Sequence, residues 1–422
     1  MERKTKRLII ISFDGLATLD FNYISELPNF KEYLREASYC KKVYSIYPSV
    51  TYPAHATIVT GKYPRSHGIV NNTLLQPSRK SPDWCWQRKY IKGETFYDAA
   101  IKKGMKVAAL LWPVTAKSKI QYNLPEIFAN RPWENQILVS LLNGSPLYQL
   151  QLNKNFGHIR QGLKQPYLDD FVHQCAIYTL KNKKPDITMI HYVDLDSMRH
   201  HYGFNSDEAK QALERHDKRL GEIIKTLKEN HLYEESTIIL LGDHSSLDKN
   251  KIISLNVLLK EKGYIKLGAG GKVVDYKAIV KSCDGSAYVY VKDEKLTDEV
   301  YFLIDNFNKE HNCIEAIYSA KEAVQFGADP SCTFMLEASL GCCFTDEMQG
   351  EIVKEEHSTK ATHGYSPFKK DYTTVFMAAG MGINKGEVIE EMNLVDEAPT
   401  IAELLGVELE NVDGRIIKQF LK

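Results

Sequence analysis

Hydrophobic and polar positions alternate along this chain with two different periods. Short, mostly apolar runs that end near Gly, Asp or Pro are typical of buried strands, and they fall at 8–13, 106–112, 187–193, 237–241 and 374–379. Between them lie stretches with apolar residues three or four apart, typical of amphipathic helices, such as 207–230. This alternation predicts an α/β fold in which helices cover both faces of a mostly parallel sheet, a three-layer α/β/α sandwich.

The pattern changes between residues 256 and 354. There, 287–291 reads as a strand, 297–307 as a helix and 332–338 as another strand, before the main pattern returns with the helix 398–405. We therefore expect an inserted α+β cap at 256–354, between a first core part at 1–255 and a second at 355–422. A shorter insertion is expected near 115–165, which shows little periodicity.

Composition limits the partners of the protein. Lys plus Arg number 54 and Asp plus Glu also number 54, so no global field attracts the chain to nucleic acid or to an anionic membrane. We expect local phosphate binding on a small molecule, no stable nucleic-acid partner and no membrane partner. The oligomeric state stays open.

Cysteine usage and the N-terminal segment bear on the compartment. The eight cysteines contain no CxxC pair, so we expect reduced thiols in a cytoplasm. Residues 1–7 are basic and 8–13 apolar, which imitates a signal peptide, but Asp14 interrupts the run and no small-residue cleavage site follows. We expect a buried strand there and a cytoplasmic protein.

Two segments near the N-terminus offer oxygen groups. Asp14 follows the first apolar run, although an Asp there is often a turn or cap residue. Thr51 stands where a helix is expected to begin, and a hydroxyl at that place can attack phosphorus when a bound cation deprotonates it. The alternative for Thr51 is an ordinary helix N-cap beside Pro53.

Later segments add carboxylates and imidazoles. Asp196 and His200 stand four apart, so they can converge on one ion, with Asp194 and His201 as rivals. Further candidates are Asp243 and His244 after an apolar run, and His363 before a Gly, with His357 as a rival imidazole. Together, oxygen and imidazole ligands at the ends of four strands are what two closely spaced zinc ions require.

These segments resemble the type I phosphodiesterase/nucleotide pyrophosphatase family of the alkaline phosphatase superfamily. The resemblance runs from residue 8 to 406 apart from the insertions, and includes 395–401 and the ending at 413–415. It implies an alkaline phosphatase-like sandwich and two zinc ions, with manganese or iron as alternative metals. It assigns one zinc to Asp196, His200 and His363, and the other to Asp14, Thr51, Asp243 and His244.

The resemblance also implies a mechanism. Thr51 attacks phosphorus and forms a phosphothreonine intermediate that is then hydrolysed. Asn72 lies twenty-one positions after Thr51 (72 − 51), where the family places the Asn that hydrogen-bonds the phosphoryl oxygen. Tyr52 stands where the family presents an aromatic ring to a nucleobase, although a plain core aromatic is an equal interpretation.

Three departures from the family pattern bear on the substrate. Ala54 replaces a common Asn, Arg199 replaces a usual Gly, and His191 or Tyr192 stands where a Tyr often hydrogen-bonds phosphate. We expect Arg199, placed beside the metals, to favour a more highly charged phosphate than a diester.

The predicted function is hydrolysis of phosphodiester or pyrophosphate bonds in nucleotide-like substrates by a metal-dependent enzyme. A phosphonoacetate hydrolase-like or phosphomonoesterase activity is the first alternative, since related phosphonoacetate hydrolases also use Thr and zinc. The second alternative is a catalytically silent protein that binds metal and nucleotide in the same pocket.

Overall fold

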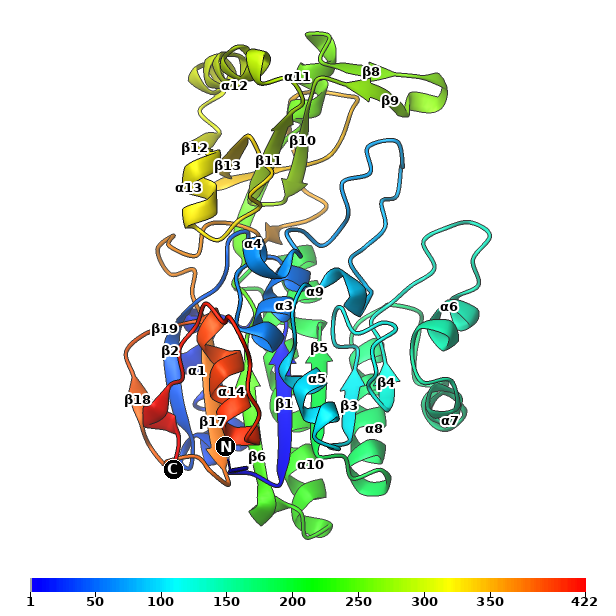
Figure 1. The fold of residues 1–422 in the computed structure, drawn as a ribbon, viewed down its shortest axis with the longest axis vertical. Coiled ribbons are helices and arrows are strands. Elements are labelled where there is room, and N and C mark those ends of the chain that lie inside the picture. Colours follow the sequence, from blue (N-terminus) through cyan, green and yellow to red (C-terminus); the bar gives the residue numbers. More distant parts are fainter. Residues whose placement is uncertain (1) are drawn as a thin grey trace.

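A nine-stranded sheet forms the centre of the larger part of the molecule in the computed structural model, which describes residues 2–422 (Figure 1). Strands β1, β3, β4, β5 and β6 run parallel, and β17 runs antiparallel between β6 and β2. The strand order is β18 (Val388–Ile389), β2 (Ser38–Tyr44), β17 (Thr374–Gly380), β6 (Ser236–Leu241), β1 (Arg7–Phe13), β5 (Ile187–Tyr192), β3 (Val107–Leu110) and β4 (Tyr122–Leu124), with β19 (Met392–Asn393) beside β2.

Helices bury both faces of this sheet. Successive side chains of a strand point to opposite faces, so Ile10 of β1 joins one apolar core and Ile11 joins the other. The first core contains residues of α3 (Thr51–Thr60), α5 (Phe96–Lys102) and α14 (Glu397–Leu405). The second contains residues of α1 (Phe21–Ile24), α2 (Pro28–Leu34), α7 (Pro146–Phe156), α8 (Tyr167–Asn182), α9 (Asp194–Tyr202) and α10 (Asp207–Glu229). The predicted three-layer α/β/α architecture is therefore confirmed.

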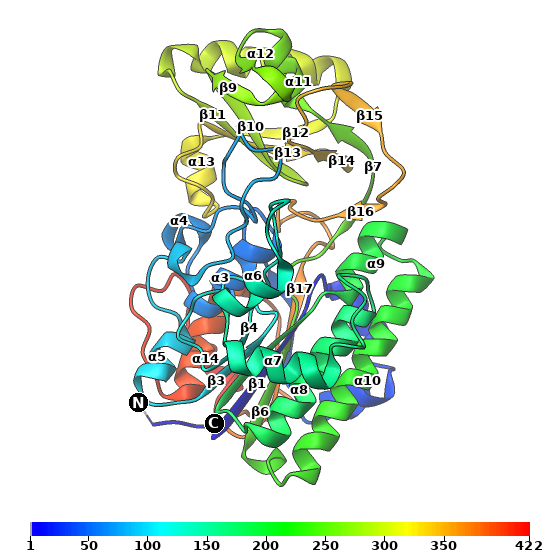
Figure 2. The same cartoon turned by 90° about the vertical axis from the view of Figure 1, so that its right-hand side faces the viewer.

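A smaller part stands above the end of the main sheet, with both chain termini at the opposite end (Figures 1 and 2). Its antiparallel sheet has the order β10 (Ala278–Cys283), β11 (Ser286–Val291), β13 (Phe334–Ala338) and β12 (Ile314–Ser319). Its remaining elements are α11 (Leu255–Glu261), α12 (Thr297–His311), α13 (Ala320–Gln325) and the hairpin β8 (Ile265–Leu267)–β9 (Val273–Tyr276).

A third small sheet connects the two parts. Strand β7 (Leu247–Ile253) pairs with β14 (Gly341–Phe344), β15 (Val353–Glu355) and β16 (Ala361–Thr362). The strands of this sheet thus come from both sides of the expected boundaries at 256 and 354. The predicted division into core and cap stays a prediction.

The segment 115–165 is more regular than its sequence indicates. It contains β4, α6 (Gln136–Asn143) and α7, which lie on the side of the molecule that faces the viewer in Figure 2. Apolar residues on α6 and on one face of α7 are exposed, which hides the usual one-sided pattern.

Two further findings concern thiols and membrane spans. All eight cysteines are buried and unpaired. Among residues 2–422, none of the helices combines the length and the apolar character needed to cross a bilayer.

Candidate active site

The first turn of α3 places Thr51 at the end of the sheet that faces the smaller part. Val50 is the extended N-cap and Thr51 the first helical residue, so the threonine lies one position inside the cap expected for it. Its Oγ1 is 3.2 Å from Nε2 of His244. The Tyr52 N–H donates to Oδ1 of Asn72 at 2.9 Å, which leaves the Asn72 amide nitrogen as a donor for a ligand.

Two acidic residues follow adjacent strands and meet beside Thr51. Asp14 follows β1 and Asp243 follows β6, and these strands pair in parallel, so their carboxyl ends lie at one edge of the sheet. Nε2 of His244 is 3.3 Å from Asp14 Oδ1 and 3.3 Å from Asp243 Oδ2. The Gly15 N–H donates to the other oxygen of Asp243 at 3.0 Å and fixes that carboxylate.

Helix α9 and the residue after β16 supply the next group. Asp196 Oδ2 is 3.3 Å from His200 Nε2, as a spacing of four on one helical face allows. His200 Nδ1 lies 2.9 Å from the Ala361 carbonyl, which orients the ring. His363 lies between the groups, with its ring centroid 5.2 Å from that of His200 and 4.1 Å from that of His244.

The rival residues point elsewhere. Asp194 is fully buried against Arg215 and Arg219, at 2.7 and 3.2 Å. His201 Nδ1 donates to the Ser197 carbonyl of its own helix, and His357 is exposed beside Glu355. The helix phase of α9 therefore separates Asp196 from Asp194 and His200 from His201.

Burial and like charges perturb the titration of this cluster. Burial, with the carboxylates of Asp243 and Asp196, raises the pKa of Asp14 to about 7. Burial alone would lower the pKa of His200, but the adjacent Asp196 raises it to about 9. For His363, burial and the nearby His244 hold the pKa well below its usual range. Three carboxylates that lie together in a largely buried site are stable in the charged form only when positive charge lies beside them.

The donor set fits divalent cations. Four buried atoms here have no hydrogen-bond partner among residues 2–422, and these are Asp14 Oδ1, Asp196 Oδ1, Asp243 Oδ2 and His363 Nδ1. Buried polar atoms normally have a partner, and carboxylate oxygens with imidazole nitrogens are common metal ligands. Two groups bring their ligand atoms within 4.8 Å of one another: Asp196, His200 and His363, and Asp14, Asp196 and His244.

A cavity of about 830 Å³ opens beside these groups. Its polar end is lined by Asp14, Thr51, Asn72, Asp196, His200 and His363, and its other walls are largely apolar and aromatic, with Tyr52, Trp84, Phe128 and Phe171. The Tyr52 ring lies 5.2 Å from that of Trp84, and its hydroxyl donates to Glu126 at 3.1 Å. Tyr52 is thus both a buried aromatic and part of the cavity wall.

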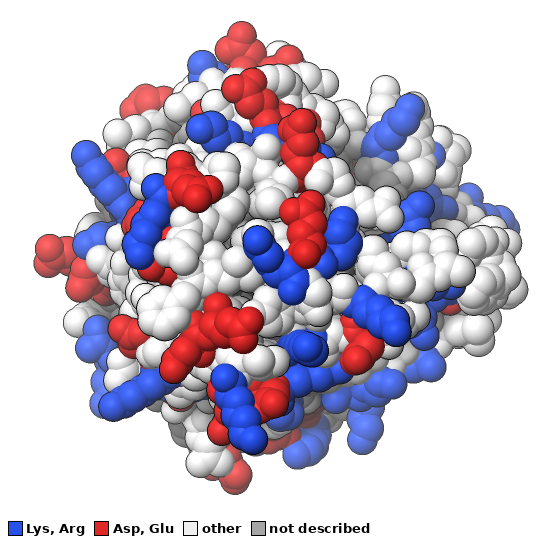
Figure 3. Space-filling model, turned by 90° about the horizontal axis from the view of Figure 1, so that it is seen from above, with Lys and Arg blue, Asp and Glu red and all other residues white. Residues whose placement is uncertain are grey.

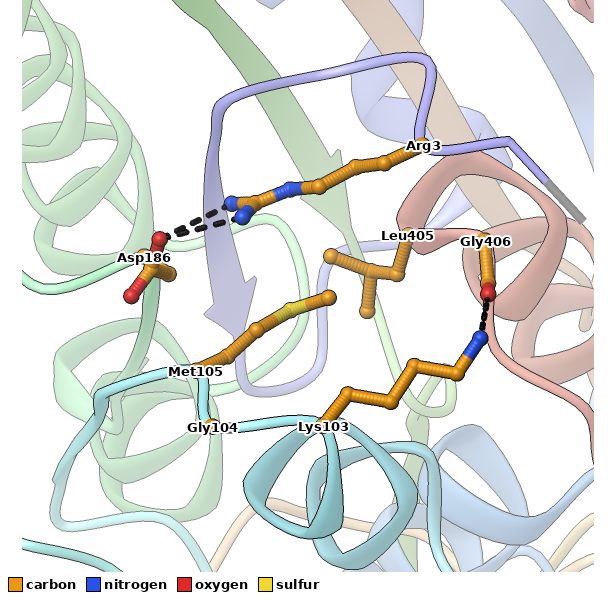
Figure 4. A pocket seen from close by; sticks show the side chains of 7 residues that line it. All are labelled: Arg3, Lys103, Gly104, Met105, Asp186, Leu405 and Gly406. Atoms are coloured by element: carbon orange, nitrogen blue, oxygen red, sulfur yellow. Dashed lines mark hydrogen bonds and ion pairs between the residues drawn. The ribbon is translucent and has the colours of Figure 1, made fainter.

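A second cavity, of about 310 Å³, lies at the opposite end of the sheet (Figure 4). Arg3 there reaches Asp186 with both terminal nitrogens at 3.1 Å, and Lys103 donates to the Gly406 carbonyl. Its cations already have partners and none of the predicted site residues lines it, so the larger cavity is the candidate active site.

The family model described as "Type I phosphodiesterase / nucleotide pyrophosphatase" matches residues 8–366. The chain belongs to this family. The family is part of the alkaline phosphatase superfamily and is metal-dependent. The predicted membership and the predicted enzyme class, a phosphodiesterase/nucleotide pyrophosphatase-like hydrolase, are confirmed at the level of the family.

Several curated relatives share this sequence pattern. The human "Ectonucleotide pyrophosphatase/phosphodiesterase family member 1" is 29% identical over 279 residues, 63% of this chain and 26% of the relative. "Venom phosphodiesterase 2" of Crotalus adamanteus is 28% identical over 249 residues, again 26% of the relative. The "Bis(5'-adenosyl)-triphosphatase ENPP4" of Pongo abelii is 22% identical over 95% of this chain and 78% of its own. The match therefore spans about a quarter of the first two relatives.

Solved structures of family members share the fold. Human ectonucleotide pyrophosphatase/phosphodiesterase 5 superposes with a TM-score of 0.71 at 21% identity, covering 99% of this chain and 100% of that one. The murine protein gives 0.70 at 20% identity over the same shares. At such identity the likeness supports the family fold alone.

One expectation drawn from the family pattern is wrong. Arg199 does not lie free beside the predicted metal ligands, because its side chain is 1% exposed. It donates to Asp20 Oδ1 at 2.5 Å and to the Gly15 carbonyl, and its guanidinium lies 3.8 Å from the Phe204 ring centroid. Arg199 therefore ties α9 to the turn after Asp14 instead of contacting a phosphate.

Sequence reasoning left His191 and Tyr192 as alternatives for the position of the family Tyr, and it did not single out Glu126. His191 on β5 lies 3.2 Å from Asp14 Oδ2 through Nε2, and its Nδ1 is 3.3 Å from Glu126 Oε2. Although burial alone would lower it, Asp14 and Glu126 raise the pKa of His191 well above its usual range. Tyr192, the other candidate for the family Tyr, points to the opposite face and bonds His173 at 2.9 Å. Side chains alternate between the two faces of a strand, and Ser12 of β1 pairs with His191 of β5. This alternation was the available signal that His191 and Tyr192 point to opposite faces of the sheet.

Proposed function

We propose that this chain hydrolyses phosphodiester or pyrophosphate bonds of nucleotide-like substrates through a phosphothreonine intermediate at Thr51. The observation that carries this proposal is the position of Thr51 Oγ1, at the first turn of α3, 3.2 Å from His244 and on the wall of the cavity. A hydroxyl there faces a buried acidic and imidazole cluster that a phosphoryl group can reach from the same cavity.

We assign the predicted ligands to two zinc ions, one at Asp196, His200 and His363 and the other at Asp14, Thr51, Asp243 and His244. When bound, zinc would supply positive charge that lowers the pKa of a hydroxyl and offsets the charge of the phosphoryl oxygens. The mixed carboxylate and imidazole donors support zinc, and manganese or iron stays an alternative.

The residues of the chain account for the covalent steps. Thr51, having lost its hydroxyl proton to solvent, forms an Oγ1–P bond while the leaving group departs with the electrons of its own bond to phosphorus. Water then forms a new O–P bond, the Oγ1–P bond breaks, and one water proton returns to Thr51. Asn72 and the backbone N–H of Thr51 hydrogen-bond the phosphoryl oxygens throughout, because the Tyr52 N–H already donates to Asn72 and Pro53 has no N–H.

The apolar end of the cavity supports a nucleotide-like substrate. Aromatic walls formed by Tyr52, Trp84 and Phe128 suit a flat base, while the polar end holds the phosphoryl group. Among the relatives, one is named a bis(5'-adenosyl)-triphosphatase, and an inactive variant of murine family member 5, with a threonine replaced by alanine, is described in complex with AMP.

A matched pair of variants tests the nucleophile. We expect Thr51→Ala to lower turnover of p-nitrophenyl thymidine monophosphate by about 10³-fold or more while keeping its bound metal, whereas Thr51→Ser keeps measurable turnover. The assays are initial rates and metal content per chain. Equal activity in Thr51→Ala would remove Thr51 from the reaction, and an inactive wild-type protein with full metal content would favour a silent binding protein.

A substrate panel tests the bond that is cleaved. The wild-type protein should prefer the thymidine diester to p-nitrophenyl phosphate and to phosphonoacetate, because only the diester carries a nucleobase for the aromatic end of the cavity. A preference for either of the other two would replace the diesterase proposal with the corresponding alternative.

We also infer a cytoplasmic location. Eight buried, unpaired cysteines are expected of a protein that folds among reduced thiols. Fractionation of the source cells with a thiol-labelling step would test this, and recovery of the protein outside the cytoplasm would reject it.

A further inference from the structure

The segment around α6 and α7 exposes an unusual set of large apolar side chains. Trp133 is 80% exposed, Leu142 75% and Leu147 84%. We call this set the α6–α7 patch, and its members are Trp133, Ile137, Leu138, Leu142, Leu147, Leu150 and Leu163. Single exposed apolar residues are ordinary, but seven within residues 133–163 indicate a binding surface.

The fold does not require these residues for its core. Helix α6 has no buried residue at all. On α7, Tyr148 and Leu152 pack into the main core, whereas Leu147 and Leu150 point outward. Lys154 follows Leu147 by seven and Leu150 by four, so it lies on the same outward face. Helix α7 therefore packs against the core through one face and exposes its other face to solvent.

Basic residues outnumber acidic ones in the segment that carries the patch. Residues 115–165 contain six Lys and Arg and only two acidic residues, although the chain as a whole carries no net charge. Lys117, Lys119, Lys154 and Lys164 are exposed, and the structure of residues 2–422 gives none of them an ion-pair partner. The Lys117 N–H donates to the Asn143 carbonyl, which places the backbone of Lys117 at the end of α6.

The two helices that carry most of the patch lie on one side of the molecule. Helices α6 and α7 both lie on the side turned to the viewer in Figure 2 and project at the right in Figure 1. Seen from above, charges of both signs mix over most of the surface, whereas the right-hand edge is mostly white and blue (Figure 3). The exposed apolar side chains of residues 133–163 and the exposed lysines near them together give this segment an apolar and positive surface.

We propose that the α6–α7 patch docks this protein onto the surface of an anionic lipid bilayer. A short amphipathic segment with Trp and Leu on one face and Lys beside them can bury the apolar groups at the headgroup boundary while the cations meet anionic lipids. Trp133, at the tip before α6, has the residue type that membrane–water interfaces favour.

The positive charge near the patch favours an anionic bilayer over a second copy of the chain as the binding partner. In a two-fold dimer the same patch meets itself, so the unpaired lysines of both copies would face one another across an apolar contact. Anionic lipid instead supplies the missing counter-charge. The balanced total charge conceals this local excess, which is why composition predicts no membrane partner.

The docking segment also borders the active-site cavity. Ile137, Arg160 and Leu163 line that cavity. Docking and substrate entry would therefore involve the same segment, although the docking proposal does not depend on the chemistry at Thr51.

Vesicle sedimentation of the full chain tests the proposal. Wild-type protein should sediment with vesicles of phosphatidylcholine and phosphatidylserine in equal amounts, and added salt should release it. The double variant Trp133→Ser, Leu147→Ser and the double variant Lys117→Glu, Lys154→Glu should each lower the partition constant by about tenfold or more.

Matched controls come from the opposite side of the molecule. Val388 is an exposed apolar residue on β18, and Lys418 is an exposed lysine near the C-terminus, at the left in Figure 1. Val388→Ser and Lys418→Glu should sediment as the wild type does. Equal thermal unfolding midpoints show that all variants are folded, because none of the substituted residues is buried.

Three results would overturn the proposal. Failure of the wild-type protein to sediment with anionic vesicles would reject the proposal, and equal sedimentation with pure phosphatidylcholine would reject an anionic surface. Sedimentation velocity could instead reveal a dimer that Leu147→Ser dissociates, without vesicle binding, which would assign the patch to a second copy.

Discussion

At the scale of single residues, Arg199 and His200 are neighbours in the sequence whose side chains point in different directions. Successive residues on a helix point about 100° apart, so His200 faces the cavity while Arg199 faces the turn after Asp14. The buried Arg199–Asp20 pair therefore positions α9, which carries Asp196 and His200, against the segment that carries Asp14.

Removing Arg199 should destabilise the protein without changing its preference for substrate charge. We expect Arg199→Ala to lower the free energy of unfolding by about 3 kcal/mol, because it leaves the Asp20 carboxylate buried without a cation. Urea unfolding measures this loss.

The double variant Arg199→Met, Asp20→Asn is the matched control, and it should recover part of the loss because no charge remains buried. In Arg199→Lys, the ratio of p-nitrophenyl phosphate turnover to thymidine diester turnover should stay as in the wild type.

A ratio shifted toward the diester in Arg199→Lys would show that the guanidinium does act on the substrate.

At the scale of elements, the turn between β10 and β11 reaches from the smaller part to the predicted metal ligands. The Gly285 N–H donates to the His363 carbonyl at 2.8 Å, and Ser286 Oγ donates to the Gly364 carbonyl at 2.7 Å. Asn71 joins the same turn by donating to the Ser282 carbonyl at 2.7 Å. His363 is thus held from the side opposite to the main sheet.

Gly364 is the point where this contact leaves no room for a side chain. Its φ is +87°, and an added Cβ would collide with the backbone of Cys283. We expect Gly364→Ala to lower the free energy of unfolding by about 3 kcal/mol and to weaken metal binding, because His363 must move with the backbone. Chemical unfolding and metal content per chain measure the two effects.

Gly386 is the control for backbone strain alone. Its φ is +76°, but nothing lies within 4 Å of an added Cβ. Gly386→Ala should cost only about 1 kcal/mol and keep the metal. Equal losses in both variants would mean that the close approach to Cys283 has no effect of its own.

At the scale of the whole molecule, Glu337 of β13 links the smaller part to the loops before α3 and after β16. It accepts from the Tyr47 hydroxyl at 2.6 Å and the Ser366 N–H at 3.1 Å, and lies 3.0 Å from Lys369. Burial raises its pKa to about 7, although Lys369 and the hydrogen bonds oppose the shift.

This raised pKa makes the stability of the molecule depend on pH. Because the folded pKa lies above the ordinary 4.5, the folded state binds the proton more tightly, and this stabilisation is complete below pH 4.5 and lost as the pH rises to about 7. Between those limits, the free energy of unfolding should fall by on the order of 2 kcal/mol more in the wild type than in Glu337→Gln.

Glu315 supplies the comparison, since it also pairs with Lys369 but is half exposed. Glu315→Gln should keep the wild-type slope of unfolding free energy against pH. A wild-type slope in Glu337→Gln would show that Glu337 stays charged across this range.

Much of the fold could be predicted because it depends on local periods. The strands β1, β5, β6 and β17 and the helix α10 lie within a few residues of their predicted positions. Strand β2 was missed because Lys41 and Lys42 interrupt its alternation, and α6 and α7 because their apolar residues face outward. Exposure is a property of the packed molecule, so no local pattern reports it.

By itself, the sequence determined the sheet and the placing of carboxylates and imidazoles at the ends of its strands, because both follow from short-range patterning and chain direction. Only the tertiary structure decided which of two nearby, chemically similar residues faces the cavity, as with Asp196 over Asp194 and His200 over His201. That choice depends on helix phase and on partners far along the chain, such as Arg215 for Asp194 and the Ala361 carbonyl for His200. The same long-range packing turned Arg199 away from the site and left the α6–α7 patch exposed.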